Sequence, residues 1–127
     1  AAALPQDQRG AIINIIDQKV WRLNPRYFSY TLSKSAFWTA TQTMAQAYAP
    51  RIRVNAVGPG PVLPNHVEGV EGFQKEAAAV PLGSSVSPEE IADAVLYLVH
   101  ARSVTGQMIA VDSGQHLAWK TPDVPEH

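Results

Sequence analysis

The chain has 127 residues, of which 46% are hydrophobic, 17% charged and 8% aromatic, a composition typical of one globular domain or part of one. Ten Lys and Arg nearly balance eleven Asp and Glu, and the net charge of −1 gives no general attraction to nucleic acid or anionic membranes. The sequence contains no Cys, which excludes disulfides and thiolate chemistry. Its four His are scattered without a zinc-binding spacing, so we expect no metal site.

Signals for membrane insertion or export are not evident in the sequence. Its apolar runs are too short for a membrane-spanning helix, and its first residues do not have the pattern of a secretory signal. Together with the lack of Cys, these features predict a cytoplasmic protein without membrane or nucleic-acid partners.

The first half of the chain predicts a strand followed by a long helix. Residues 11–16 form an apolar run rich in β-branched side chains, which is typical of a strand buried on both faces of a parallel sheet. Residues 27–48 contain no Gly or Pro, so we expect one helix there that ends before Pro50. Apolar residues occur on nearly every side of this helix, which predicts that it is buried all round and that part of it forms a subunit interface.

The second half repeats this alternation with shorter elements. Residues 51–57 predict a second strand, the Gly- and Pro-rich segment 58–65 predicts a loop, and residues 65–80 show a weak helical pattern. The sequence Ser-Pro-Glu-Glu at 87–90 marks the start of an amphipathic helix, with a Ser cap and Pro in the first position. Residues 107–111 predict a third strand.

The order strand, helix, strand, helix, strand favours an α/β fold with parallel strands and right-handed crossovers. Three strands are half of a doubly wound sheet, and no Gly-rich strand-to-helix turn is present to hold a pyrophosphate. We therefore expect residues 1–116 to be the C-terminal half of a Rossmann-like doubly wound parallel sheet, without its N-terminal nucleotide-binding half. Residues 117–127 are expected to form a C-terminal tail.

Tyr30 and Lys34 form the first candidate pair for chemistry. They lie four residues apart near the start of the long helix, about one turn, so both side chains project from one face. A Lys ammonium favours a nearby phenolate and lowers the pKa of the phenol from its usual value of about 10. The pair could therefore transfer protons nearer to neutral pH. A surface pair without function is the alternative interpretation of this common spacing.

Two further segments are expected to lie close to Tyr30 and Lys34. Asp17 follows the first strand and precedes Tyr30 by 13 residues, and residues 55–60 follow the second strand. The carboxyl ends of parallel strands meet at the edge of the sheet where open α/β folds bind their ligands. We therefore expect a functional site at this edge. In the alternative interpretation, Asp17 only begins a loop and binds local backbone N–H groups.

Four motifs in this order resemble the C-terminal half of short-chain dehydrogenase/reductases, over residues 9–116. The motifs are Ile-Ile-Asn-Ile at 12–15, Tyr-Thr-Leu-Ser-Lys-Ser-Ala at 30–36, Arg-Val-Asn-Ala-Val-Gly-Pro-Gly at 53–60, and Thr-Gly-Gln at 105–107 with Val-Asp-Ser-Gly at 111–114. The resemblance implies a Rossmann-like fold and an NAD(P)-dependent oxidoreductase.

The resemblance also implies roles for individual residues. Tyr30 would donate a proton to the group that is reduced. Lys34 would hold the hydroxyls of the nicotinamide ribose and lower the pKa of Tyr30. Residues 65–86 would form the substrate loop. Three residues would line the nicotinamide: Pro59, Gly60 and Val62.

The chain departs from the family pattern at three positions. Asp17 stands where most members have a catalytic Ser, and an ionised carboxylate can only accept hydrogen bonds, so it suits a substrate with N–H donors or a step that needs a second acid. An Asp-Tyr-Lys set of this kind resembles the pteridine reductase branch, which includes bacterial dihydromonapterin reductases. Pro64 replaces a Thr that contacts the pyrophosphate in many members, and Pro has no N–H to donate. Ser113 replaces a common Gly.

The aromatic residues divide into groups with different expected roles. Trp21 and Phe28 flank the loop after the first strand, and we treat them as candidates for binding a planar substrate. Two others are expected to pack in the core or in an interface: Phe37 and Trp38. His116 and Trp119 are expected to dock the tail, and the alternative is that they reach the site of a neighbouring subunit.

The resemblance therefore implies an oxidoreductase that reduces a pteridine-like C=N bond, with Asp17, Tyr30 and Lys34 as catalytic residues and Asp17 also binding the substrate. NADP(H) is expected rather than NAD(H), on the ground of the branch alone. We expect a homodimer or homotetramer. Two alternatives stay open: a carbonyl reductase or alcohol dehydrogenase of the same family, and a catalytically degenerate member that acts as a binding or assembly module.

Overall fold

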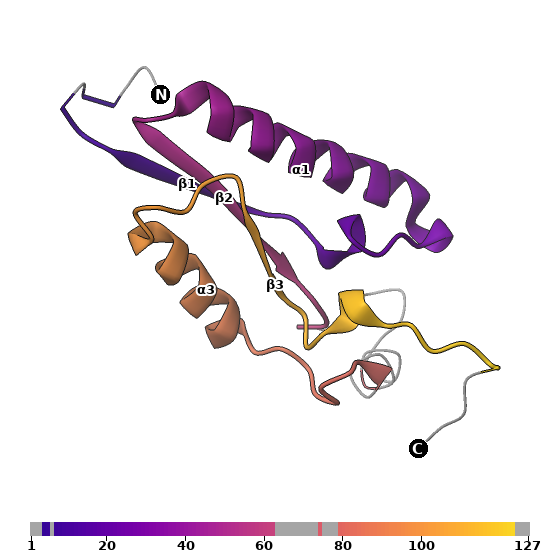
Figure 1. Ribbon diagram of the computed structural model, residues 1–127. Coiled ribbons are helices and arrows are strands. Elements are labelled where there is room, and N and C mark those ends of the chain that lie inside the picture. The colour runs from indigo at the N-terminus through magenta and orange to yellow at the C-terminus, as the bar shows by residue number, and fades with distance from the viewer. Residues whose placement is uncertain (1–3, 6, 63–73, 75–78, 124–127) are drawn as a thin grey trace.

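A computed structural model of the chain describes residues 4–5, 7–62, 74 and 79–123 (Figure 1). Within these residues, three parallel strands form one sheet in the order β1 (Gly10–Ile15), β2 (Ile52–Pro59) and β3 (Met108–Val111). Two helices cover the sheet, α1 (Phe28–Tyr48) and α3 (Pro88–His100). The α/β class and the parallel pairing predicted from the sequence are confirmed.

α1 packs on the face of the sheet that carries the even-numbered residues of β2. Phe37 and Trp38 pack against a buried cluster made of Ile16, Ala56 and Met108. Their expected role in core packing is therefore confirmed. A second cluster, toward the start of β2, joins three buried residues: Ala45, Ile52 and Val54.

α3 covers the opposite face of the sheet. Its predicted start is confirmed, because Ser87 accepts a hydrogen bond from the Glu90 backbone N–H at 3.2 Å and Pro88 takes the first helical position. Leu98 has no exposed surface. Arg53 of β2 donates to carbonyl oxygens in the last turn of the helix, including that of Leu98 at 2.8 Å. This guanidinium therefore fastens the end of α3 to the central strand.

The two crossovers of the sheet have opposite hands. Both connections step in the same direction across the sheet, from β1 to β2 and from β2 to β3, yet α1 and α3 lie on opposite faces (Figure 1). Two right-handed crossovers that step in one direction would place both helices on one face. The expectation of right-handed crossovers is therefore wrong for one of the two connections.

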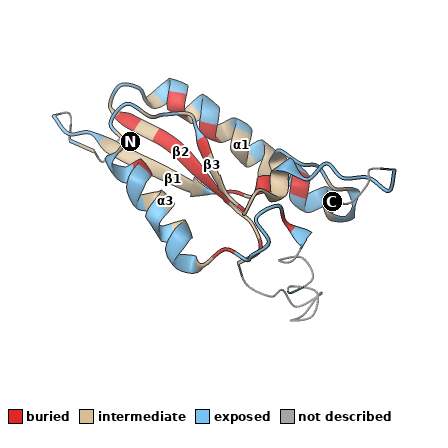
Figure 2. Ribbon diagram, turned by 60° about the horizontal axis from the view of Figure 1, so that its bottom comes forward, coloured by how far each residue is buried: buried red, intermediate tan, exposed pale blue. Residues whose placement is uncertain are grey.

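β2 is buried because helices cover both its faces and strands pair with both its edges (Figure 2). Residues 54–57 have no exposed surface. The buried amide of Asn55 is satisfied by the segment before β3, since its Nδ2 donates to the Val104 oxygen at 2.8 Å and its Oδ1 accepts from the Gln107 N–H at 3.0 Å. These bonds fix where β3 begins relative to β2.

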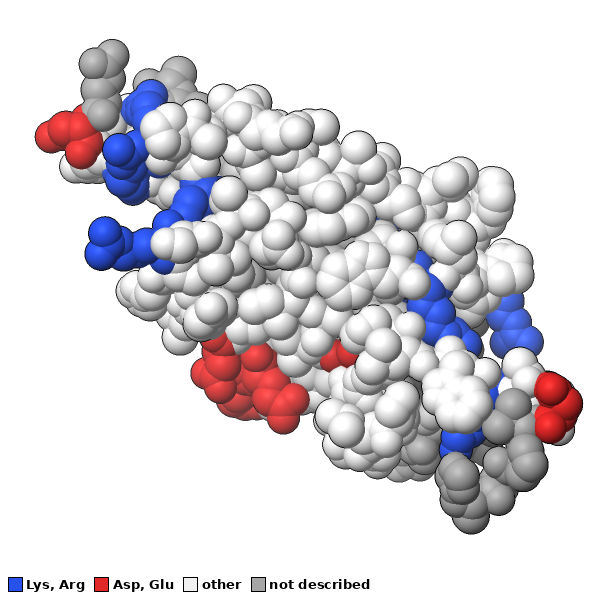
Figure 3. All heavy atoms as spheres, viewed as in Figure 1, with Lys and Arg blue, Asp and Glu red and all other residues white. Residues whose placement is uncertain are grey.

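α1 is not buried on every side, which corrects the sequence prediction. Its buried residues are Thr31, Thr41 and Ala45, whereas 69% of Phe28 and 57% of Leu32 are exposed. The reason is that the sheet covers one side of the helix only. In the view of Figure 3, the surface over α1 carries few Lys, Arg, Asp or Glu side chains. A subunit interface on this surface stays a prediction.

The remaining segments fill in the connections. Two short 3-10 turns, η1 (Gln18–Val20) and η2 (Pro25–Tyr27), occupy the predicted loop between β1 and α1, and η3 (Gln115–Leu117) opens the tail.

Pro64 and most of the weak helical pattern at 65–80 lie outside the described residues. None of the helices in the described ranges has the length and apolar character needed to cross a membrane.

Gly60 is required where the ends of β2 and β3 approach each other. A Cβ at this position would lie 2.6 Å from the Cα of Asp112, and backbone atoms cannot move aside as a flexible side chain could. We expect Gly60→Ala to lower the free energy of unfolding by about 1–3 kcal/mol, measured from the midpoint of urea denaturation. Gly10→Ala is the matched control, because its nearest neighbours are side-chain atoms at 3.5 Å. Equal midpoints for the two variants would contradict this packing.

Candidate active site

The carboxyl ends of the three parallel strands lie at one edge of the sheet, and polar groups follow them closely. Asp17 comes two residues after β1, Gly60 directly after β2 and Asp112 directly after β3. The connection from β1 then turns back, so that Tyr30 in the first turn of α1 reaches Asp17. The structure thus brings together the residues that the sequence placed at this edge.

Asp17 uses its two carboxylate oxygens for two different partners. Oδ1 accepts a hydrogen bond from the Lys19 backbone N–H at 2.9 Å, which makes Asp17 the N-cap of η1. Oδ2 accepts from the Tyr30 hydroxyl at 2.8 Å. The local contact of the alternative interpretation is therefore present, and so is the contact with Tyr30, on separate atoms of one side chain.

Two lysines flank the Tyr30 ring. Lys34 Nζ lies 5.7 Å from the ring centroid, so Tyr30 and Lys34 share one face of α1 as their spacing predicts. Lys19 was not recognised from the sequence. Its Nζ lies 3.8 Å from Asp17 Oδ2, 4.8 Å from the Tyr27 ring centroid and 6.0 Å from that of Tyr30. The signal that could have found it is its place two residues after a capping Asp, inside a tight turn.

The electrostatics of Tyr30 differ from the sequence prediction. Its pKa is raised above the ordinary value of 10.0, first because burial disfavours the phenolate, then because its hydroxyl donates to Asp17 and the negative charge of Asp17 repels a phenolate. The net shift is thus upward rather than downward, because the phenol is partly buried and the carboxylate bonds directly to its hydroxyl, whereas the ammonium of Lys34 lies over the ring. Tyr30 is therefore held protonated, as a hydrogen-bond donor.

The three residues expected to line a nicotinamide follow the end of β2. Pro59 is the last residue of the strand, the Gly60 N–H donates to the Val111 oxygen at 3.0 Å, and Val62 is half-buried. Gly58, predicted as the first residue of a loop, belongs to β2 and lets the strand pass close to the turn after β1. A Cβ there would lie 3.3 Å from the Gln18 backbone nitrogen. Contact of these residues with a cofactor stays a prediction.

The two aromatic residues proposed for substrate binding are both exposed, in different settings. Trp21 is the C-cap of η1, and 43% of its surface is exposed. Its ring makes edge contacts with those of Trp38 and His116. Phe28 starts α1 and is 69% exposed. Trp21 is therefore held by neighbours, and its contact with a substrate, like that of Phe28, stays a prediction.

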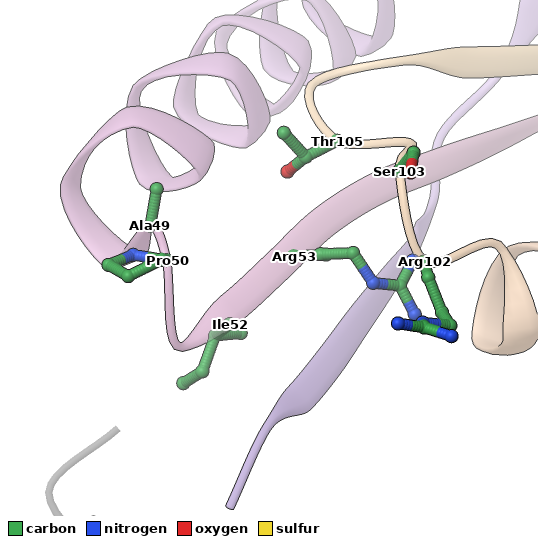
Figure 4. Close-up of a pocket in the computed structure, with 7 residues that line it drawn as sticks. All are labelled: Ala49, Pro50, Ile52, Arg53, Arg102, Ser103 and Thr105. Carbon is green, nitrogen blue, oxygen red and sulfur yellow. The ribbon is translucent and has the colours of Figure 1, made fainter.

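A pocket of about 270 Å³ lies at the other end of the sheet, where α1 ends and β2 begins (Figure 4). It is lined by Ala49, Pro50, Ile52, Arg53, Arg102, Ser103 and Thr105. The guanidinium of Arg53 is already bonded to the last turn of α3, and none of the predicted site residues reaches this pocket. We therefore place the candidate site at the Asp17–Tyr30 edge.

Comparison with known proteins defines the class of this protein. The sequence profile described as "Enoyl-(Acyl carrier protein) reductase" matches residues 1–116. The parallel sheet and the order of the motifs along the chain agree with this match. The chain belongs to the short-chain dehydrogenase/reductase family.

Particular relatives are more informative than the family. The chain is 33% identical to the dihydromonapterin reductase of Citrobacter koseri, over 84% of this chain and 44% of that protein. It is 37% identical to carbonyl reductase family member 4 of Danio rerio, over 85% of this chain and 46% of that protein. It is 56% identical to FolM alternative dihydrofolate reductase 1 of Brucella canis, whose crystal structure is complexed with NADP; the TM-score is 0.93, over 98% of this chain and 50% of that one. The chain thus spans about half the length of these proteins.

The cause assigned to the raised pKa of Tyr30 can be tested by removing the charge of Asp17. Asp17→Asn keeps an acceptor and a capping side chain but removes the negative charge, so we expect the pKa of Tyr30 to fall toward its ordinary value. The measurement is an ultraviolet titration of phenolate absorbance, with Tyr30→Phe used to identify the Tyr30 signal among the four tyrosines. An unchanged Tyr30 titration in Asp17→Asn would show that the carboxylate does not control this phenol.

Proposed function

We propose that this chain is part of an NADPH-dependent oxidoreductase that reduces a pteridine-like C=N bond. The observation that carries the proposal is the 2.8 Å hydrogen bond from the Tyr30 hydroxyl to Asp17 Oδ2, with Lys34 beside the phenol ring. A protonated phenol, a hydrogen-bond acceptor and a cation are thereby gathered at the edge of the sheet where α/β folds bind ligands.

The site residues fit the nicotinamide end of a dinucleotide. Among the described residues, Lys34 has one hydrogen-bond partner, the Ile15 oxygen, at the long distance of 3.5 Å. Its ammonium therefore keeps donors for ribose hydroxyls. Gly60 and Val62, after β2, would lie against the nicotinamide ring. When bound, NADPH would supply the hydride that reduces the ring carbon of the substrate.

The proton that completes the reduction would come from Tyr30. A phenol is protonated at neutral pH, so the hydroxyl, once released from Asp17, can donate to the ring nitrogen beside the carbon that receives the hydride. Asp17 would accept hydrogen bonds from N–H groups of the substrate, because an ionised carboxylate is an acceptor only. Lys34 would then stabilise the phenolate left behind until solvent returns a proton.

Two relatives support the substrate class and the cofactor. The Citrobacter koseri relative is a dihydromonapterin reductase, and the Brucella canis protein is an alternative dihydrofolate reductase complexed with NADP. Both names denote reduction of a pteridine ring system. We extend that ring system, and NADP(H) rather than NAD(H), to the protein that contains this chain.

Carbonyl reduction is the second candidate function. The observation that favours it is the 37% identity to carbonyl reductase family member 4 of Danio rerio, a relative matched over a comparable length. The two functions make opposite demands on Asp17, since a carbonyl oxygen needs a donor and a pterin N–H needs an acceptor. Substitution at this position therefore separates them.

The proposal extends to the whole protein. We propose that residues 1–116 are the C-terminal portion of a single reductase domain and 117–127 its tail, because the chain spans about half of each relative. We further propose a cytoplasmic homodimer or homotetramer. The exposed apolar residues of α1, including Phe28 and Leu32, support such an interface, since large uncharged surfaces usually mark contacts with other chains.

Replacing the phenol tests whether Tyr30 is the proton donor. We expect Tyr30→Phe to lower kcat for NADPH-dependent reduction of 7,8-dihydrobiopterin by roughly 100-fold or more, the usual contribution of a general acid, with NADPH binding retained. The measurement combines NADPH absorbance with fluorescence titration of the cofactor. Tyr97→Phe, at an exposed position of α3, is the control. Normal turnover in Tyr30→Phe would refute the role given to this residue. Absence of turnover in a wild-type protein that includes the nucleotide-binding half would favour the degenerate binding module.

Replacing the carboxylate tests the substrate class. Ser at position 17 keeps a side-chain acceptor that can cap η1, but it removes the negative charge and adds an O–H donor. We expect Asp17→Ser to lower kcat/KM for 7,8-dihydrobiopterin by roughly 10- to 100-fold, the usual cost of losing a hydrogen bond to a charged group, while reduction of a small ketone is kept or improved. Unchanged pterin reduction would remove the main support for a pteridine reductase.

A further inference from the structure

The turn that follows β3 is built around a buried carboxylate. Asp112 is 2% exposed; its Oδ1 accepts from the Gly114 N–H at 3.0 Å, and its Oδ2 accepts from the His116 backbone N–H at 2.9 Å. Oδ2 also lies 2.7 Å from Nδ1 of the His116 ring. We refer to residues 112–116 as the Asp112 turn. Its carboxylate fixes both the backbone of the turn and the orientation of the imidazole.

The imidazole in turn holds Trp21. The rings of His116 and Trp21 meet at 61° with centroids 5.4 Å apart, and Trp21 meets Trp38 at 86° with centroids 6.2 Å apart. Trp38 packs against the core between α1 and the sheet. Trp21 is therefore clamped between a core residue and a ring that the buried Asp112 orients, and it still exposes 43% of its surface.

A second contact ties the Asp112 turn to the same segment. The Gln18 side-chain Nε2 donates to Gln115 Oε1 at 3.0 Å, and Gln18 is 3% exposed. Gln18 and Trp21 both belong to the η1 turn that Asp17 caps. Asp17 is the N-cap of this turn and Trp21 its C-cap, so the two residues stand at its opposite ends.

The Asp112 turn also contacts the segments that bound the site on its other sides. Gly60 lies against the backbone of Asp112, since a Cβ there would be 2.6 Å from its Cα. The Ser113 oxygen accepts from the Leu82 N–H at 3.0 Å, near the end of the expected substrate loop. One turn thus fixes the η1 segment, the end of β2 and the base of that loop relative to one another.

We propose that Trp21 forms the aromatic wall against which the planar ring of the substrate stacks, and that His116, oriented by Asp112, is the positioning residue for that wall. This inference rests on the proposed reduction of a pteridine-like ring. It assigns ring recognition to Trp21 and leaves the proton chemistry to Asp17 and Tyr30. His116 acts through Trp21 and does not itself touch the reacting atoms.

The position of Trp21 can be followed independently of activity. The chain contributes three Trp, so labelling with 5-fluorotryptophan gives a fluorine NMR signal from each of them, and Trp21→Phe identifies the signal of Trp21. We expect His116→Ala to shift or broaden the Trp21 signal and leave that of Trp119 unchanged. His100→Ala, an exposed His in the last turn of α3, is the control and should move none of them. A Trp21 signal unchanged by His116→Ala would overturn the positioning role.

Kinetics then test ring recognition. Loss of an aromatic contact costs roughly 3- to 10-fold in affinity, so we expect His116→Ala and Trp21→Leu to raise KM for 7,8-dihydrobiopterin by that factor with kcat nearly unchanged. KM for a small aliphatic ketone should stay the same, because it has no ring to stack. Trp21→Phe keeps an aromatic face and should restore most of the affinity. Equal KM values for 7,8-dihydrobiopterin in wild type and Trp21→Leu would refute the aromatic wall.

Failure of the proposed function gives a different result from failure of this inference. If the wild-type protein reduces no pterin, the proposed function fails, and titration of the fluorinated protein with 7,8-dihydrobiopterin decides the inference alone. A dose-dependent shift of the Trp21 signal, lost in His116→Ala, supports a ring site at Trp21. A Trp21 signal that does not respond to the pterin overturns it.

Discussion

The carboxylate of Asp17 organises the candidate site because one of its oxygens caps a local turn and the other binds a residue of α1. Oδ1 caps η1 by accepting from the Lys19 N–H at 2.9 Å, and Oδ2 accepts from the Tyr30 hydroxyl at 2.8 Å. The first bond fixes the turn after β1, and the second joins that turn to the first turn of α1. Together with burial of the phenol, this contact raises the pKa of Tyr30.

This carboxylate is in the right place because the sheet brings the strand ends together. β2 lies between β1 and β3 with helices on both faces, and its residues 54–57 are fully buried. Glycines at 58 and 60 let its carboxyl end approach the turns after β1 and β3 closely. A larger side chain at either position would push apart the segments that carry Asp17 and Asp112. Packing of the backbone, more than any polar contact, thus sets the spacing of the site.

The second main feature of the structure is the apolar side of α1 that stays exposed. A three-layer unit of this size buries only the sheet-facing side of its long outer helix, and Phe28 and Leu32 stay accessible. In a chain that spans about half of its relatives, such a surface is where further protein would be expected to pack. Asp17, Tyr30 and Lys34 are all contributed by β1, α1 and their connection, so their mutual geometry does not depend on that packing.

Local sequence patterns predicted the alternation of strands and helices with bounds close to those observed, because β-branched runs, the Ser87 cap and Pro50 act locally. It also predicted that Tyr30 and Lys34 share a helix face and that Asp17 lies at the same sheet edge. The remaining features depend on contacts between segments that are distant in the sequence. The Tyr30 pKa shift depends on how far the phenol is buried and on which charged group reaches its hydroxyl. The hand of each crossover depends on which face of the sheet its own helix covers. The contact of Gln18 with Gln115 joins residues 97 positions apart, and no local pattern records such a pairing.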